Sequence, residues 1–156
     1  MRILVVSDTH GDVHSLLELL RTNSTAQVVI HCGDGASDVQ EVAHLFPSKM
    51  FISVRGNCDF CTDVPYAESI TLEGKKIFVT HGHLYNVKSD LYALSLSARE
   101  QGADMVLFGH THVQTEIYDD GLYMLNPGSL KGWGGTYALV DINDKGILIN
   151  CLSKNS

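Results

Sequence analysis

Short apolar runs recur along this sequence, and a cluster of Asp, His, Asn and Gly residues follows each run directly. Runs of Val, Ile and Leu this short are typical of buried strands in a sheet. Because the carboxyl ends of parallel strands meet at one edge of a sheet, we expect the polar clusters to lie together. Taken alone, any one cluster could be an ordinary polar turn. The pairs are Ile3–Val6 before Ser7–His10, Val28–Ile30 before His31–Asp34, Phe51–Val54 before Arg55–Asp59, Ile77–Val79 before Thr80–His83, and Met105–Phe108 before Gly109–His112.

Amphipathic segments between these runs predict helices. Apolar residues over 13–20 recur at helical spacing, and Asp12 stands where an N-cap is expected. Ser37 and Gln40 resemble a capping box that would start a second helix. Ser89 is expected to cap a third helix. The front half of the chain is therefore predicted to alternate between strands and helices.

The second half is predicted to be rich in strands. A turn at Glu73-Gly74 indicates a hairpin that ends near Thr80. Two packed sheets flanked by helices would bury both kinds of strand, so we expect an α/β (α+β) fold. No long linker or repeat interrupts the sequence, which predicts a single domain over residues 1–156. Further short strands are expected at Val113–Tyr118, Leu122–Leu125, Tyr137–Ile142 and Ile147–Leu152.

Composition and charge exclude several classes of function. The 156 residues carry a formal net charge of −7, which argues against a broad electrostatic grip on nucleic acid. Hydrophobic residues make up 44% and charged residues 19%, as in an ordinary soluble protein. No apolar stretch approaches the roughly 20 residues of a membrane span, and the N-terminus lacks the pattern of a signal peptide. We expect a cytoplasmic protein with no membrane partner and no strong nucleic-acid binding.

The donor atoms at the strand ends indicate a metal site. Carboxylate, imidazole and amide donors suit Mn, Fe, Zn, Co or Ni, and they disfavour a soft thiolate site. There are more donors than one ion needs, so two ions that share a bridging carboxylate are expected. Paired ions about 3.5–4 Å apart recur in enzymes that carry out displacement at phosphorus. An acidic chain could then act on a small phosphorylated substrate.

In order along the chain, the strand ends contain D-x-H, G-D, G-N-C-D, H-G-H and G-H-T-H, and N-P-G-S follows at Asn126–Ser129. This ordered set resembles the calcineurin-like metallophosphoesterase superfamily. The spacing and the small size are most similar to its compact bacterial and archaeal phosphodiesterase branch. The resemblance covers nearly the whole chain. It implies a four-layer αββα sandwich, in which two mixed β-sheets are flanked by helices.

The resemblance also implies two divalent metal ions, with Mn expected first and Fe, Zn, Ni or Co as alternatives. Asp34 would bridge the two ions. A water or hydroxide shared by the ions would attack the phosphorus of a small phosphodiester in line. One ion would be held by Asp8, His10 and His112, and the other by Asn57, His81 and His110.

Several residues are candidates for direct roles in catalysis or substrate binding. Many superfamily members have a histidine where this chain has Cys58, and a thiol is a poor general acid. The cysteine favours phosphodiesters with good leaving groups, and His83 either replaces the acid or is an ordinary loop histidine. Asp59 could orient nearby groups, and Asn57 could donate its amide N–H to phosphate if its oxygen is the ligand. Arg55 could reach a phosphate oxygen or form a surface ion pair.

Other classes of function stay open at this point. Relatives in the eukaryotic retromer complex use the fold as a non-catalytic, metal-binding scaffold for protein interactions. Those scaffolds typically lose metal ligands, whereas every expected ligand is present here. Cys58-Asp-Phe-Cys61 matches C-x-x-C, a weak redox signal in a predicted loop. An exposed sheet edge could support a homo-oligomer, and Trp133 could either flank the site or cover the edge of the core.

Overall fold

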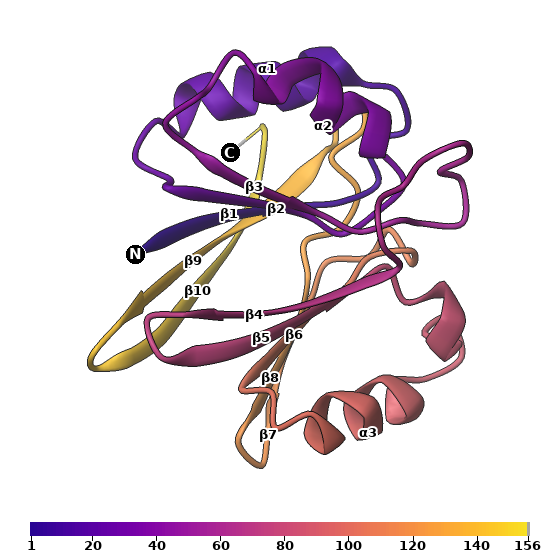
Figure 1. Cartoon of the computed structure of the whole chain (residues 1–156), viewed down its shortest axis with the longest axis vertical. Helices are drawn as coiled ribbons and strands as arrows, with labels where there is room; N and C mark the ends of the chain where they lie inside the picture. Colours follow the sequence, from indigo (N-terminus) through magenta and orange to yellow (C-terminus); the bar gives the residue numbers. More distant parts are fainter. Residues whose placement is uncertain (156) are drawn as a thin grey trace.

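Two five-stranded sheets pack face to face in the computed structural model of the chain, which describes residues 1–155 (Figure 1). The strands are β1 Arg2–Val6, β2 Val28–His31, β3 Met50–Ser53, β4 Ala67–Leu72, β5 Lys75–Thr80, β6 Met105–Leu107, β7 Thr115–Asp119, β8 Leu122–Asn126, β9 Thr136–Asn143 and β10 Gly146–Ser153. The helices are α1 Val13–Thr22, α2 Ala36–Ala43 and α3 Tyr92–Glu100, with a short 3₁₀ helix, η1, at His83–Tyr85.

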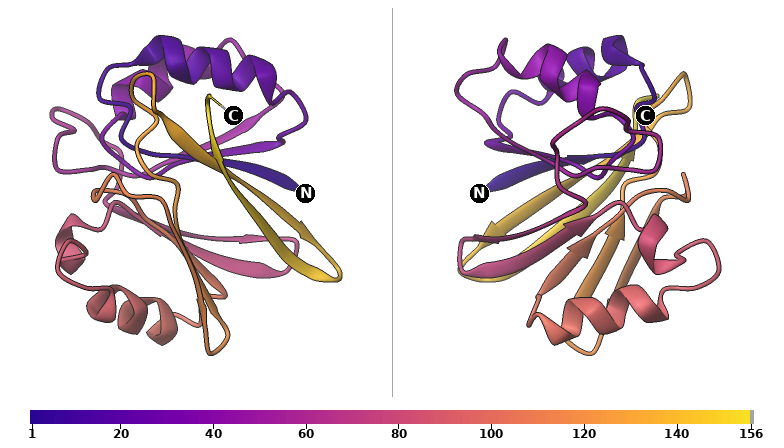
Figure 2. Two further views of the ribbon diagram at one scale, coloured as in Figure 1. Left: turned by 180° about the vertical axis from the view of Figure 1, so that it is seen from behind. Right: turned by 45° about the vertical axis from the view of Figure 1, so that its right-hand side comes forward.

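Both sheets are mixed. The first has the order β10-β9-β1-β2-β3, in which β1, β2 and β3 are parallel and β9 is antiparallel to both of its neighbours. The second has the order β4-β5-β6-β8-β7, with β5, β6 and β8 parallel and β4 and β7 antiparallel at its edges. Helices α1 and α2 cover the outer face of the first sheet, and α3 covers that of the second (Figure 2). The predicted four-layer αββα sandwich is confirmed.

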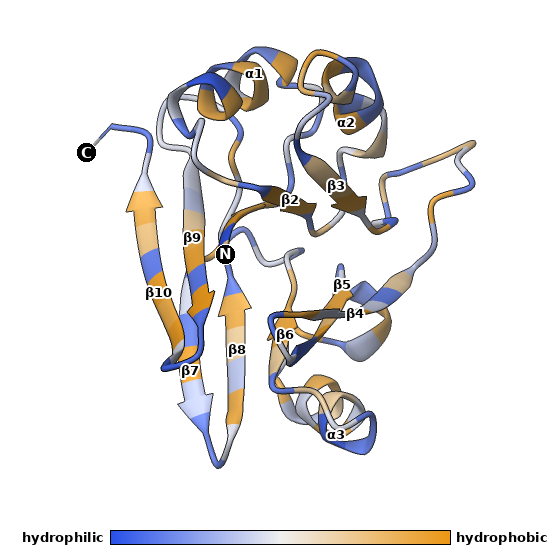
Figure 3. Cartoon of the chain, turned by 60° about the vertical axis from the view of Figure 1, so that its left-hand side comes forward, coloured by the Kyte–Doolittle hydropathy of each residue, from blue (hydrophilic) through white to orange (hydrophobic). Residues whose placement is uncertain are grey.

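Burial on both faces explains the continuous apolar runs. Along β1, Ile3 and Val5 pack between the sheets, while Leu4 and Val6 pack beneath the helices. Successive side chains of a strand point to opposite faces, so a strand covered on both sides is apolar at every position. A third cluster, which includes Phe108, lies beneath α3. Figure 3 shows that the strands carry most of the apolar residues, whereas turns such as that between β7 and β8 are hydrophilic.

The start of α1 agrees with the sequence-based expectation, and the start of α2 does not. Asp12 is the N-cap of α1 and accepts the Ser15 N–H at 3.1 Å. Helix α2 begins at Ala36, so Ser37 lies inside its first turn, and the predicted capping box is wrong. The Ala36 N–H donates instead to Asp59, at 3.0 Å, from a loop 23 residues further along the chain. A cap this distant in sequence leaves no local signal.

Other boundaries also differ from the prediction. Helix α3 begins at Tyr92 rather than next to Ser89, and Asp90 accepts the Tyr92 N–H at 2.9 Å. Strand β7 begins at Thr115, two residues after the predicted start. Among the helices described in residues 1–155, none is long and apolar enough to cross a membrane.

Candidate metal centre

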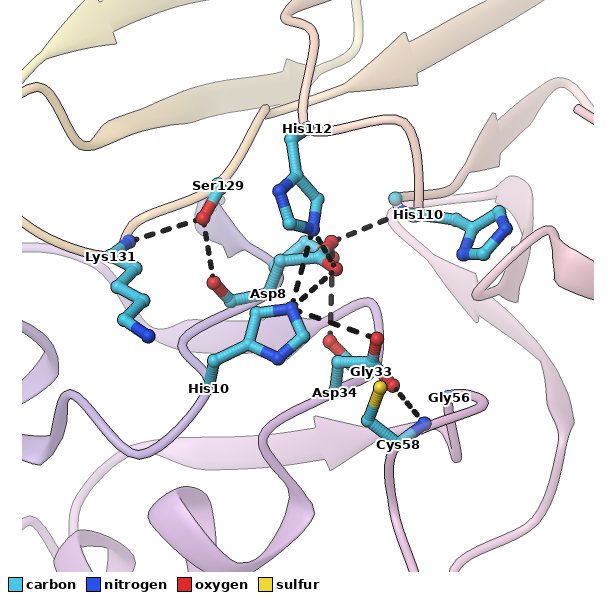
Figure 4. Close-up of polar contacts among 12 residues, drawn as sticks. Asp8, His10, Gly33, Asp34, Gly56, Cys58, His110, His112, Ser129 and Lys131 are labelled. Atoms are coloured by element: carbon cyan, nitrogen blue, oxygen red, sulfur yellow. Dashed lines mark hydrogen bonds and ion pairs between the residues drawn. The ribbon is translucent and has the colours of Figure 1, made fainter. Parts of the chain in front are cut away.

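The loops that follow β1, β2, β3, β5 and β6 meet at one edge of the sandwich, where their polar side chains converge (Figure 4). Asp8 and Asp34 are almost fully buried, with 0% and 3% of their surface exposed. Oδ1 of Asp8 lies 3.0 Å from His112 Nε2 and 3.3 Å from His10 Nε2. Oδ2 of Asp34 lies 3.2 Å from His81 Nε2. Both sheets therefore contribute donors to one cluster.

The donors form overlapping groups of the kind that hold metal ions. Asp8 belongs to two of them and connects His10, from the first sheet, with His81 and His112, from the second. The side-chain oxygen of Asn57 lies 3.0 Å from His81 Nε2, next to the second group. The ligand atoms lie within 4.8 Å of one another in each of three groups, which are Asp8, His10 and His112; Asp8, Asp34 and His81; and His10, Asp34 and Cys58.

His110, the remaining predicted ligand, belongs to none of the groups found in residues 1–155. Its backbone N–H donates to Asp8 Oδ2 at 3.1 Å. Its ring points away from Asp8 and His10 in Figure 4, and the ring centroid lies 5.0 Å from that of His81. The structure thus brings His110 beside the histidine with which the sequence pairs it, but its ring nitrogens stay outside the cluster.

His81 is held in the orientation that a metal ligand needs. Its Nδ1 donates to the Cys32 carbonyl at 2.8 Å, because a carbonyl can only accept. This leaves Nε2 facing the carboxylates. Burial alone would lower the pKa of His81, but the hydrogen bond to Asp34 and the charge of Asp8 outweigh it and raise the pKa. Fixing the second ring nitrogen is the usual way in which proteins orient a metal-binding histidine.

The carboxylates of this cluster pair only with imidazoles. Within residues 1–155, every ion pair recorded for Asp8 and Asp34 is with a histidine. Burial alone would raise the pKa of Asp34, but hydrogen bonds with His81 and the Cys58 N–H bring it well below its usual range. Buried charges require pairing or a metal ion, and this mixture of carboxylate, imidazole and amide donors fits divalent cations such as Mn or Zn.

The backbone at the predicted ligands adopts a conformation that L-residues seldom take. Asp8, His10, Asp34, His110 and His112 have φ between +44° and +71°. They are five of the nine non-glycine residues with positive φ in the part of the chain that the structure describes. Backbone strain of this kind is concentrated at ligand-binding and catalytic sites.

Two glycines give the carboxylates their room. A Cβ at Gly56 would collide with the side chain of Asp34, and a Cβ at Gly109 would collide with Ser7 and lie 2.7 Å from the carboxylate of Asp8. Both positions follow predicted strands, where glycine was expected only as a turn residue. At both positions the backbone passes so close to a predicted metal-binding carboxylate that a side chain would not fit.

Asp59 positions the loop that carries Asp34. Its two carboxylate oxygens accept four backbone N–H groups at 2.8–3.0 Å, from Asp34, Gly35, Ala36 and Gly56. A carboxylate has about four acceptor positions, so Asp59 is occupied as an anchor between the loops after β2 and β3.

A second buried network lies behind His10. His31 accepts the Gly33 N–H at Nδ1, and its Nε2 therefore donates to Thr9 Oγ1, at 2.9 Å. Thr9 donates in turn to Asp38 at 2.5 Å. Burial lowers the pKa of His31 to about 4. The sequence gave no sign of the roles of Thr9 and Asp38.

The N-P-G-S segment supports two of the ligand loops. The side-chain amide of Asn126 donates to the carbonyl of Gly109 at 3.0 Å and to Thr111 at 2.9 Å. Ser129 donates to the main-chain carbonyl of Asp8 at 2.8 Å. The segment served only as a family marker in the sequence, and the structure shows that it ties the G-H-T-H loop to the D-x-H loop.

The other predicted residues lie around the rim. Cys58 is an exposed residue. Partial desolvation of its thiol, together with the charge of Asp34, raises the pKa of that thiol. Arg55 donates through Nε to the Asp59 carbonyl at 3.1 Å, and its guanidinium lies 5.0 Å from the centroid of the Tyr66 ring. The ring of His83 lies 5.5 Å from that of His81, and its buried Nδ1 has no hydrogen-bond partner within residues 1–155.

Cys61 and Trp133 contribute no donor to the groups found in residues 1–155. Cys61 is an exposed free thiol, and the C-x-x-C segment lies in a loop, as predicted. Trp133 is 85% exposed and lines a cavity with Glu18 and Lys154 beside α1. It therefore does not cover the core.

Comparisons with known proteins agree on one family for this chain. The family model described as "Calcineurin-like phosphoesterase superfamily domain" matches residues 1–145. The chain is 37% identical over 132 residues to "Probable metallophosphoesterase YsnB" of Bacillus subtilis, which covers 84% of this chain and 76% of that protein. It is 28% identical over 190 residues to "Phosphodiesterase YfcE" of Escherichia coli, covering 95% and 96%. A solved Streptococcus pneumoniae structure described as a "predicted phosphoesterase" superposes with a TM-score of 0.84 at 31% identity, covering 99% of this chain and 90% of that one.

Proposed function

This chain belongs to the calcineurin-like phosphoesterase superfamily, and we propose that it is a phosphodiesterase that works with two divalent ions, Mn foremost. One observation carries the proposal. Two buried carboxylates, Asp8 and Asp34, face the Nε2 atoms of histidines from both sheets, and no Lys or Arg is paired with them in residues 1–155. The similarity to a protein named as a phosphodiesterase supports the choice of diester over monoester.

The first proposed ligand set is one of the groups that contain Asp8, and the second is centred on His81. Asp34 would bridge the ions, because it lies within 3.7 Å of His10 and within 3.2 Å of His81. His110 would join the second set, since its ring already lies beside His81. One set is Asp8, His10 and His112, and the other is Asn57, His81 and His110.

Ions bound there would activate a water nucleophile and neutralise charge on the phosphate. The remaining steps fall to the side chains around them. With Asn57 Oδ1 toward His81, its Nδ2 lies outward, 3.5 Å from Cys58 Sγ, where it can donate to a phosphate oxygen. Arg55, stacked on Tyr66, can contact a second phosphate oxygen. The four free cysteines suit a reducing compartment, so we place the enzyme in the cytoplasm.

Proton transfer to the leaving group limits the substrates. Cys58 lies beside Asp34, and a thiol is a weak acid for this task. His83, whose Nδ1 has no hydrogen-bond partner within residues 1–155 and whose ring lies 5.5 Å from that of His81, is the better candidate. We therefore expect faster cleavage of diesters with acidic leaving groups, such as bis(4-nitrophenyl) phosphate, than of alkyl monoesters.

The test combines metal analysis with hydrolysis. Wild-type protein, stripped and reloaded with Mn, should hold two ions and cleave bis(4-nitrophenyl) phosphate faster than 4-nitrophenyl phosphate. Asp34→Asn should lose activity by at least about a hundredfold and lose bound metal, because both ions lose a ligand. Asp63→Asn alters an exposed carboxylate outside the cluster and should match the wild type. Full activity of metal-free Asp34→Asn would refute the proposal.

The interaction scaffold is the alternative, and the same measurements separate the two. A scaffold would bind metal and turn over no diester, nucleotide or monoester. The complete set of predicted ligands, six of which lie within one cluster, favours the enzyme.

A further inference from the structure

A second cavity opens directly beside the metal centre. It has a volume of about 270 Å³ and lies between the first turns of α2 and the loop after β3. We call it the side cavity. It shares Ser37, Cys58 and Asp59 with the cavity of about 230 Å³ that contains His10 and Asp34. Since their walls are shared, a phosphate held at the centre can extend one of its ester groups into the side cavity.

An unburied aromatic ring forms part of this cavity. Phe60 is 77% exposed and belongs to none of the apolar clusters within residues 1–155. A large aromatic ring exposed next to a polar site indicates ligand binding more strongly than a single exposed leucine does. Its faces are free to stack on a planar group.

The opposite wall is polar but carries no positive charge. Exposed Ser37 and Gln40 project from α2, and Thr62 completes the rim. Among the described residues that line the cavity there is no Lys or Arg, and Asp59 adds a negative charge. A second phosphate would find no cationic partner there. A simple alkyl chain would make no hydrogen bond with the Gln40 amide.

We infer that the side cavity binds a planar ring with a hydrogen-bonding edge, of the nucleobase type, carried on one ester group of the phosphodiester. Phe60 stacks on the ring, and Gln40 binds its edge. The volume suits one ring system rather than two. This assignment rests on the proposed phosphodiesterase function, because it needs the phosphate to lie at the metal centre.

Binding measurements with Mn-loaded protein test the assignment without requiring turnover. Thymidine 5′-monophosphate should bind more tightly than 2-deoxyribose 5-phosphate, which lacks the base. Phe60→Ala should weaken thymidine 5′-monophosphate about tenfold, the usual effect of removing a stacking partner, and leave the sugar phosphate unchanged. Phe60→Trp, which keeps an aromatic ring at this position, should bind thymidine 5′-monophosphate about as tightly as the wild type. Tyr92→Ala removes a ring that is 73% exposed on α3, and it should have no effect on this binding.

A further comparison tests whether the polar edge of the ring contributes to binding. Phenyl phosphate offers a plane without polar edges, so Phe60→Ala should weaken its binding while Gln40→Ala should affect only the thymidine compound. If Phe60→Ala changes neither ligand, the inference is wrong. If the protein cleaves diesters but Phe60→Ala does not weaken ligand binding, the proposed function stands and the assignment of the side cavity is refuted. If the protein binds the base through Phe60 but cleaves no diester, the assignment of the side cavity stands and the proposed function is refuted.

Discussion

The side chains assigned to the ions stand on backbone that most L-residues avoid. A residue in the left-handed region costs roughly 1–2 kcal/mol, and five of the predicted ligands lie there. Stability in most domains is only about 5–15 kcal/mol, so the surrounding bonds must hold this geometry firmly. Asp59 and Asn126 supply such bonds through the main chain. These bonds fix the loops that carry the predicted ligands.

Gly56 tests how closely that shape is set. Gly56→Ala forces a methyl group against Asp34, so Mn affinity should fall about 10–100-fold, in the range seen when groups that orient ligands are changed. Gly134→Ala faces open space and should bind Mn like the wild type. Calorimetric titration of both variants decides the matter, and equal affinities would show that the position of Asp34 is not critical.

The sequence predicted candidate ligands because each one carries its own donor beside a strand. The residues that position them could not be found this way. Asp38 and Ser129 bind groups that are 29 and 121 residues away in sequence, and neither stands in a pattern that indicates a partner. His110 was expected among the ligands, but its ring orientation depends on packing against His81, which spacing alone does not determine.

Helix ends show the same division between local and distant causes. Asp12 caps α1 through a neighbour three residues away, and the sequence predicted it. The first N–H groups of α2 are bound by Asp59 from another loop, and the sequence misplaced that cap. Local patterns therefore predicted which segments are helical better than where α2 and α3 begin.

Asp12 also joins α1 to the loop that follows the N-P-G-S segment. One oxygen accepts the Ser15 N–H and the other accepts the Gly132 N–H, at 3.1 and 2.8 Å. Asp12→Ala should lower the free energy of unfolding by about 1–2 kcal/mol, because cap and tether are both lost.

Asp12→Asn separates the two contributions. Asparagine caps helices as well as aspartate, but its amide nitrogen cannot accept the Gly132 N–H. Urea denaturation should therefore place Asp12→Asn between the wild type and Asp12→Ala. If Asp12→Asn is as unstable as Asp12→Ala, the cap contributes nothing and the tether carries the whole effect.

The arrangement of the sheets joins distant parts of the chain. Continuous apolar runs predicted buried strands, and the family resemblance supplied the four layers. Which strands pair could not be read from those runs, because β1 pairs both with β2 and with β9 near the other end of the chain. Apolar periodicity gives each strand two buried faces but says nothing about its neighbours at the sides.

Ion binding should stabilise the whole sandwich. The predicted ligands come from β1, β2 and β3 of the first sheet and from β5 and β6 of the second. A ligand that binds only the folded state at a hundredfold excess over its Kd contributes about 2.7 kcal/mol, so Mn should raise Tm by roughly 5–10 °C in a domain of this size. Calorimetry with Mn and with EDTA measures this shift. Asp34→Asn should show a much smaller one, and an equal shift would place the ions elsewhere.

Because the donors stand on opposite sides of the junction between the sheets, each ion would also be a removable cross-link. A copy that has acquired no metal would have only the apolar core and hydrogen bonds such as that from His81 to the Cys32 carbonyl to hold that edge closed, and its strand ends would open to proteases more often. Limited proteolysis should cut the metal-free protein first in the loops after β2 and β3. Metal supply would then govern the lifetime of each molecule in the cell as well as its rate of turnover.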